Sequence, residues 1–134
     1  MATLFSKIIA GEIPCEKIWE DEGFFAFLDI HPIQPGHTLL VPKMEIDYPF
    51  DLSDEMYCAF FLAAKKLVPA IQRATGCVKV ALVIEGLEVP HAHMKLVPIS
   101  HMGDLAQSNA YDATADELAE MANRIRLEIQ GQRA

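Results

Sequence analysis

The chain alternates between short apolar stretches and longer segments whose apolar residues recur at helical spacing. The first three short stretches are rich in aromatic and branched residues and are bounded by turn residues, as strands are. Asp21 and Glu22 separate the first two stretches, so we expect these two to form a hairpin. The predicted strands cover residues 16–20, 23–29 and 37–42.

Three segments show the apolar periodicity of a helix. Asp51 or Ser53 can cap the longest one at its start, and Gly76 ends it. Thr114 and Glu117 have the spacing of a capping box at the start of the last one. The predicted helices are a short one over 4–13, a long one over 53–75 and a C-terminal one over about 114–130.

Two further strands are predicted over residues 77–86 and 89–98, so the long helix lies between the third strand and the fourth. About five strands in this arrangement indicate an α+β fold with a mostly antiparallel sheet. A chain of 134 residues is about the size of one domain, so we expect a single domain over 1–134.

Charge and cysteine content exclude several classes of function. The formal net charge is −8 with no long run of basic residues, which argues against binding to a nucleic-acid backbone. The N-terminus has only a short apolar stretch, so neither a signal peptide nor a membrane anchor is expected. Cys15, Cys58 and Cys77 form neither a disulfide framework nor a Cys-x-x-Cys metal motif. We therefore expect a cytoplasmic protein with reduced thiols.

The stretch VPHAHMKLVP, residues 89–98, carries polar groups where a buried strand would be apolar. Because side chains alternate along a strand, we expect His91, His93 and Lys95 on one face, roughly 6.6 Å apart in succession. Ala92, Met94 and Leu96 would then face the core.

The residues alone leave three interpretations of this polar face open. In the first, the side chains only decorate a solvated surface. Alternatively, His91 and His93 could bind a metal ion, completed by Glu88, His37 or His101 if the fold brings one of them near. In the third interpretation a neutral imidazole attacks phosphorus and Lys95 supplies charge to the phosphate oxygens.

Three segments in the same order resemble the histidine triad (HIT) family. Residues 5–43 are similar to the N-terminal half of that family, including Asp29-Ile30 followed by Pro32, Pro35, Gly36 and His37. The segment FDLSDE opens the long helix, and EVPHAHMKLVP lies where the family has His-x-His-x-His. The resemblance covers roughly residues 3–100.

The resemblance implies a homodimer in which two subunits join their sheets into one of ten strands. It also implies hydrolysis or transfer on purine nucleotide conjugates, such as phosphoramidates or dinucleoside polyphosphates, with no obligatory metal or other cofactor. His93 would be the nucleophile that becomes nucleotidylated, His91 would orient it or support the phosphate, and His37 would be a supporting partner. The nucleotide would contact a set of residues carried over from the resemblance or adjoining the triad: Asp29, Ile30, Phe5, Ile8, Ile13 and Glu88.

The sequence departs from the family pattern at three places. Lys95 stands in the position of the third histidine, and the loop before His91 is compact, with apolar Ile84 and Leu87. Family members with structural zinc carry cysteines and a histidine where this chain has Thr3, Ser6 and Glu45, so we predict no structural zinc. These departures keep two alternatives open: a nucleotide-binding or interaction protein with weak or lost activity, and a metalloprotein that uses His91 and His93.

Overall fold

The computed structural model describes residues 2–132 and shows one five-stranded, fully antiparallel sheet. The strand order is β1-β2-β3-β5-β4, which leaves β1 and β4 at the edges. This sheet and its helices confirm the predicted α+β class and the predicted order of elements. The strands are β1 (Lys17–Glu20), β2 (Phe24–Leu28), β3 (Thr38–Pro42), β4 (Lys79–Val83) and β5 (Met94–Ile99).

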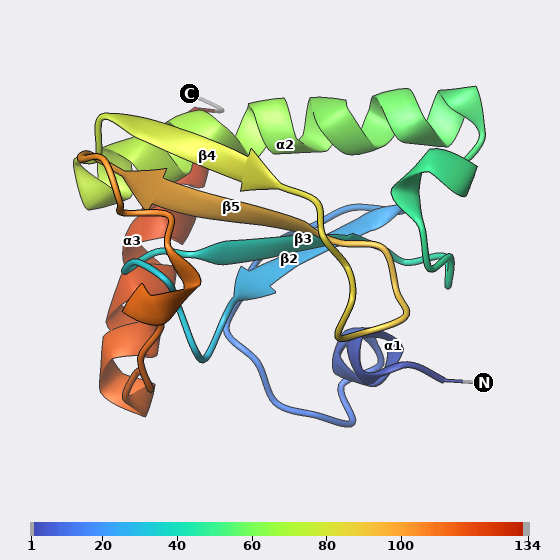
Figure 1. Cartoon of the computed structure of the whole chain (residues 1–134), viewed down its shortest axis with the longest axis horizontal. Coiled ribbons are helices and arrows are strands. Elements are labelled where there is room, and N and C mark those ends of the chain that lie inside the picture. Colours follow the sequence, from blue (N-terminus) through green and yellow to red (C-terminus); the bar gives the residue numbers. More distant parts are fainter. Residues whose placement is uncertain (1, 133–134) are drawn as a thin grey trace.

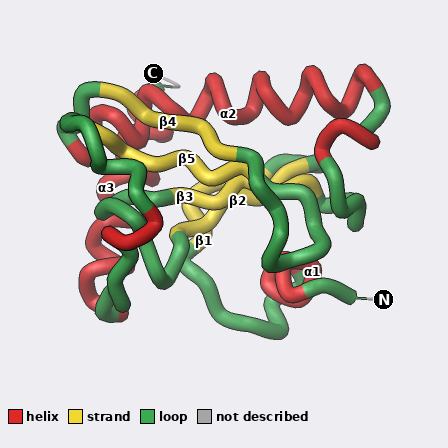
Figure 2. The backbone as a smooth tube through the Cα atoms, in the orientation of Figure 1, coloured by secondary structure: helices red, strands yellow, loops and turns green. Residues whose placement is uncertain are grey.

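Helices cover both faces of the sheet. In Figure 1, α2 (Asp54–Thr75) runs along one face and α1 (Leu4–Ile9) lies below the other, while α3 (Ala115–Gly131) packs against α2 and β1. Two short 3-10 turns, η1 (Pro49–Asp51) and η2 (Gln107–Asn109), lie in the connections. Figure 2 shows the loop between β4 and β5 reaching down to α1. Within residues 2–132, no helix is both long enough and apolar enough to cross a membrane.

Each face of the sheet has its own apolar cluster. Phe60, Leu67 and Ile71 of α2 and Ile125 of α3 pack on one face. Phe5 and Ile8 of α1 pack on the other face, against residues of β2 and β3. Every residue of β2 and β3 is therefore buried, which explains why both strands are apolar at every position except Thr38 rather than alternating.

Local capping sets the helix boundaries close to those predicted. The Ser53 side chain accepts a hydrogen bond from the N–H of Met56, and Gly76 ends α2 in the left-handed region with φ of 70°. The Thr114 side chain accepts a hydrogen bond from the N–H of Glu117 at the start of α3. Helix α1 is shorter than predicted and ends at Ile9, because the chain turns at Gly11 with φ of 84°.

The strand predicted over 89–98 is the main error of the sequence prediction. Strand β5 begins only at Met94, so His91 and His93 precede it and do not share a strand face with Lys95. The N–H of Ala92 donates to the carbonyl of Ile46 instead of joining the sheet ladder. The backbone before Met94 therefore bonds to the loop after β3. As a result, the His91 and His93 rings lie in different surroundings.

Candidate active site

A pocket of about 470 Å³ opens on the α1 face of the sheet. Its walls come from α1, from the end of β2, from β3 and β5, and from the loop between β4 and β5. Nine of the ten site residues predicted from the sequence line this pocket, and His91 is the exception. The nine are Phe5, Ile8, Ile13, Asp29, Ile30, His37, Glu88, His93 and Lys95.

His93 has one ring nitrogen fixed by the protein and the other available. Its Nδ1 lies 2.8 Å from the backbone oxygen of His91, and because a carbonyl only accepts, Nδ1 carries the proton. In the neutral ring the lone pair is then on Nε2. Burial lowers the pKa of His93, and the nearby Lys95 charge acts in the same direction. His93 is thus a neutral imidazole at neutral pH. It lines the pocket, and its Nε2 carries a lone pair that no protein group occupies.

His91 is held by the protein at both ring nitrogens. Its Nε2 donates to the carbonyl of Pro42 at 2.7 Å, so Nδ1 of the neutral ring accepts from the hydroxyl of Thr3, also at 2.7 Å. The residue is fully buried. The structure therefore places the His91 ring outside the pocket, where it ties the N-terminal segment to the end of β3. It can orient His93 only through its backbone carbonyl.

His37 is also buried, and it is connected to Asp29. Its Nδ1 accepts a hydrogen bond from the N–H of Ile33 at 3.0 Å, so the proton is on Nε2. That Nε2 lies 3.6 Å from a carboxylate oxygen of Asp29 and has no hydrogen-bond partner among the described residues. Burial lowers the pKa of His37 to about 4, opposed by the Asp29 charge and assisted by Lys95 and His93.

Gly36 is required for this placement of His37. Its φ is 92°, and a Cβ there would lie 2.6 Å from a methyl group of Thr75 in α2. Only glycine combines that conformation with such a close approach of the backbone to the helix. The Pro-Gly-His sequence noted above is therefore the turn that directs the His37 ring inward.

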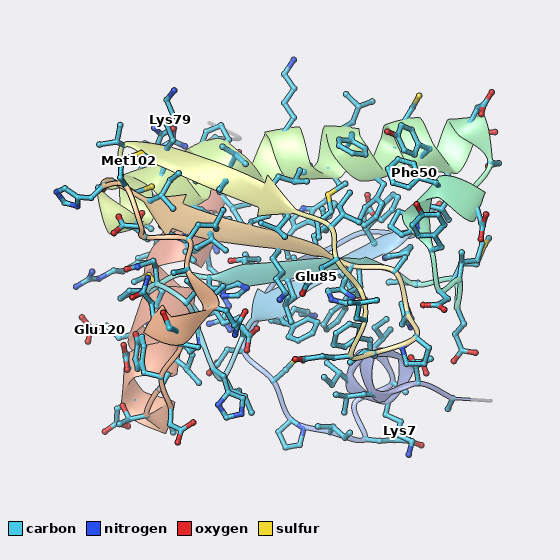
Figure 3. The ribbon with its side chains drawn as sticks, in the orientation of Figure 1. Lys7, Phe50, Lys79, Glu85, Met102 and Glu120 are labelled. Atoms are coloured by element: carbon cyan, nitrogen blue, oxygen red, sulfur yellow. The ribbon has the colours of Figure 1, made fainter. Side chains whose placement is uncertain are left out.

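Charged side chains of both signs line the pocket. Lys95 on β5 is the cation, and the carboxylates are Asp29 at the end of β2 and Glu85 and Glu88 on the loop between β4 and β5. Figure 3 shows Glu85 on that loop, at the opposite end of β4 from Lys79. A nucleotide phosphate in this pocket would meet one positive charge, from Lys95.

The rest of the pocket is apolar. Leu4, Phe5 and Ile8 of α1 and Ile13 after it form one wall, and Val89 of the later loop packs against the same apolar cluster. The Phe5 ring touches the His93 ring edge to face, with centroids 5.0 Å apart. An apolar wall beside a polar floor is what a heteroaromatic base joined to a phosphate would fit.

The metal alternative finds little support in this geometry. No group of three or more His, Cys, Asp or Glu side chains able to hold a metal ion occurs within residues 2–132. Both nitrogens of His91 are occupied by Pro42 and Thr3, so a metal could replace neither without breaking a buried hydrogen bond. At the position of the family's structural zinc, Thr3 and Ser6 offer hydroxyl groups that take part in the cap of α1, a donor set that does not suit zinc. The absence of zinc stays a prediction.

Several residues that shape the site were not predicted. The carbonyl of Pro42 and the N–H of Ile33 fix two imidazoles through the backbone, which no side-chain pattern reveals. The hydroxyl of Thr3 bonds His91 across 88 residues of sequence. A signal for Thr3 did exist, since Thr-x-x-Ser before an apolar run is a helix N-cap, and the capping box with Ser6 is present.

Comparison with known proteins agrees with the resemblance drawn from the sequence. A family model described as "HIT domain" matches residues 10–102, more than half of the chain. This chain belongs to the HIT family. The prediction of the family is therefore confirmed, and the β4-β5 loop and β5 lie inside the matched region.

Relatives of known name and structure extend over nearly the whole chain. "Protein hit" of Bacillus subtilis is 33% identical and covers 91% of this chain and 90% of its own length. The adenosine 5′-monophosphoramidase HNT1 of Saccharomyces cerevisiae is 31% identical, covering 97% of this chain and 84% of its own. The crystal structure of a Hit-like protein from Bartonella henselae superposes with a TM-score of 0.82 at 27% identity, covering 94% and 95% of the two chains.

Proposed function

We propose that this protein binds a purine nucleotide conjugate in the pocket and cleaves it at the α-phosphorus through a covalent nucleotidyl intermediate on His93. The bond cleaved would be a phosphoramidate or a phosphoanhydride. Two relatives described as adenosine 5′-monophosphoramidases, from Saccharomyces cerevisiae and Schizosaccharomyces pombe, support nucleotide hydrolysis as the class of reaction.

One observation carries the proposal: the hydrogen bond from His93 Nδ1 to the carbonyl of His91. It fixes the tautomer in which Nε2 is unprotonated, and a buried neutral imidazole of this kind is a nucleophile at neutral pH. The bond also persists after attack, because the ring then carries a positive charge that the carbonyl oxygen stabilises.

The proposed reaction has two steps. The Nε2 lone pair of His93 attacks the α-phosphorus, an N–P bond forms, and the bond to the leaving group breaks with its electron pair. Water then attacks the same phosphorus, the N–P pair returns to Nε2, and one proton of that water passes to solvent. Lys95 would stabilise the negative charge on the phosphate oxygens in both steps.

The surrounding residues suggest how the nucleotide lies. The carboxylate of Asp29 can accept hydrogen bonds from ribose hydroxyls, and Ile30 is beside it at the rim of the pocket. The apolar wall of Phe5, Ile8 and Ile13 would hold the base. In this arrangement Glu88 covers the pocket from the loop.

Replacing His93 with alanine tests the proposal. His93→Ala should lower hydrolysis of adenosine 5′-phosphoramidate and adenosine 5′-phosphosulfate at least about 10³-fold, while AMP binding measured by calorimetry persists. His101→Ala is the matched control, because His101 is an exposed histidine outside the pocket, and it should leave turnover unchanged. Undiminished hydrolysis by His93→Ala would exclude this mechanism.

A second candidate is a nucleotide-binding protein with weak or lost activity. Lys95, two residues after His93, favours it, because an ammonium cannot exchange protons near neutral pH as an imidazole does. The calorimetry above separates the candidates: AMP binding without turnover by the unmodified protein would support this second function.

We propose further that the protein is a homodimer and acts in the cytoplasm. Strand β4 is an edge of the sheet, and the exposed Leu82 on it is available for pairing with a second copy. The three cysteines are unpaired, as is usual in a reducing compartment. A solution mass equal to one chain of 14.9 kDa would contradict the dimer.

A further inference from the structure

None of the three buried imidazoles, His37, His91 and His93, is placed to donate a proton to a leaving group at neutral pH. His91 lies outside the pocket with both nitrogens bonded to the protein. His37 is neutral because burial lowers its pKa to about 4, and the remaining N–H of a neutral imidazole is not an acid in water. The N–H of His93 stays on the His91 carbonyl while Nε2 acts as nucleophile.

The other titratable groups of the lining do not supply the missing acid. Asp29, Glu85 and Glu88 also line the pocket, and an ionised carboxylate only accepts hydrogen bonds. His31 is at the rim with a side chain 62% exposed, and its Nδ1 lies 2.8 Å from the carboxylate of Asp112 outside the pocket lining. The thiol of Cys15 also lines the pocket, and burial raises its pKa, so it is a weaker acid than an ordinary thiol.

Lys95 offers a fixed charge in place of a proton. It is half-buried on β5 and lines the pocket together with His93. Among the ion pairs and side-chain hydrogen bonds of residues 2–132, none involves its ammonium. A lysine ammonium carries three N–H donors and no acceptor, so it interacts with an anion as a point charge.

Leaving groups differ in the assistance that they need when their bond to phosphorus breaks. Sulfate, phosphate and carboxylate leave as stable anions, so a nearby positive charge is sufficient to assist their departure. The nitrogen of a phosphoramidate must be protonated before or during P–N cleavage, and this requires an acid of suitable strength. A pocket that offers a fixed cation and no suitable proton donor therefore favours substrates whose leaving group departs as a stable anion.

We propose that Lys95 determines the leaving group, so that the protein cleaves nucleoside monophosphates joined to an acidic group, in mixed anhydrides, in preference to phosphoramidates. This inference rests on the proposed function and specifies its substrate class. The Nε2–P bond forms, the bond from phosphorus to the bridging oxygen breaks, and the electron pair leaves on that oxygen as an anion paired with the Lys95 ammonium. Water then releases the nucleotide and the proton goes to solvent.

The test compares two substrates that share the AMP moiety: adenosine 5′-phosphosulfate and adenosine 5′-phosphoramidate. We expect kcat/KM of the unmodified protein to be at least about 100-fold higher for the phosphosulfate. Lys95→Met should lower phosphosulfate cleavage by about tenfold or more and phosphoramidate cleavage by less. Lys95→His should raise phosphoramidate cleavage by about tenfold or more and narrow the preference. AMP calorimetry on each variant confirms that the pocket is intact.

Two control variants complete the comparison. Lys79→Met removes a positive charge at the far end of β4, outside the pocket (Figure 3). It should leave the ratio of the two kcat/KM values, phosphosulfate over phosphoramidate, unchanged. His31→Ala should also leave the ratio unchanged, whereas selective loss of phosphoramidate cleavage would identify His31 as a proton donor and overturn the inference. Equal rates on both substrates, or a ratio that Lys95→His does not change, would overturn it as well. Failure of the proposed function has a different signature, which is undiminished hydrolysis of both substrates by His93→Ala.

Discussion

His91 and His93 are two residues apart and both almost fully buried, yet their surroundings differ at the level of single nitrogen atoms. Both ring nitrogens of His91 bond to the protein, to Pro42 and Thr3. His93 bonds through one nitrogen only, to the His91 carbonyl. Burial alone thus does not distinguish a structural histidine from a candidate nucleophile, whereas an unprotonated ring nitrogen without a protein partner does.

The two surroundings also differ in what they contribute to stability. Around His91, the hydrogen bonds with Thr3 and Pro42 satisfy every polar atom of the ring. In the pocket, His37 Nε2 is buried without a hydrogen-bond partner, which costs about 1–3 kcal/mol. Lys95 adds a cation that lowers the pKa of His93 and His37. The surroundings of His91 stabilise the fold, and that fold holds the pocket residues in place.

Alanine substitution at His91 should therefore mainly lower stability, and alanine substitution at His93 should mainly lower activity. His91→Ala removes a fully buried ring and leaves the Pro42 carbonyl without its partner, so the free energy of unfolding should fall by about 3 kcal/mol. His93→Ala should cost about 1 kcal/mol, because its ring faces a pocket that water can fill. Urea denaturation of both variants beside the unmodified protein measures the difference.

The companion measurement is turnover of the two adenosine substrates at a temperature where both variants are folded. His91→Ala should retain measurable turnover because the backbone carbonyl that orients His93 remains. A stability loss that is equal in the two variants would remove the distinction between the two regions.

The pocket should also make the protein sensitive to acid. The pKa of His37 is about 4 in the folded chain against an ordinary value of 6.5, so between these pH values the unfolded chain binds a proton that the folded chain does not. Stability is then complete above pH 6.5 and falls as the pH drops toward 4, by on the order of 3 kcal/mol. The lowered pKa of His93 acts in the same direction.

Urea denaturation from pH 7 to pH 4 measures this fall. His37→Asn is the control variant, since an asparagine oxygen can replace Nδ1 as acceptor for the Ile33 N–H but does not titrate. The variant should lose much of the pH dependence between 6.5 and 4. If the slope of stability against pH stays the same in His37→Asn, the assignment to His37 is wrong.

Local patterns in the sequence predicted most of the fold because local interactions produce it. The caps Ser53, Gly76 and Thr114 work through neighbouring backbone groups, and the sequence predicts Gly76 and Thr114 outright and Ser53 as one of two candidates with Asp51. The apolar stretches of β2 and β3 predict strands for the same reason, whereas their burial on both faces depends on the packing of α1.

The strand predicted over residues 89–98 is wrong because local patterns do not identify distant hydrogen-bond partners. Apolar and polar side chains do alternate through His91 and His93, but the backbone there bonds to Ile46 rather than to the sheet. Whether an alternating segment joins a sheet depends on partners that are distant in sequence. The same limit applies to His91, whose partners are 88 and 49 residues away. The residues of the pocket could be chosen from the family resemblance, but which nitrogen of each was free could not.

The smallest predicted effect concerns Thr3, which connects the two regions because it caps α1 and bonds His91. Thr3→Val keeps the shape of the side chain but removes the hydroxyl that accepts from the Ser6 N–H and bonds His91 Nδ1. We expect a loss of about 1 kcal/mol in the free energy of unfolding. Because α1 forms the apolar wall of the pocket, KM for an adenosine substrate should rise severalfold while kcat changes little. Thr3→Ser restores the hydroxyl and should restore KM. A fall in kcat at unchanged KM would instead mean that the His91 region acts on the chemistry at His93 and not only on the position of α1.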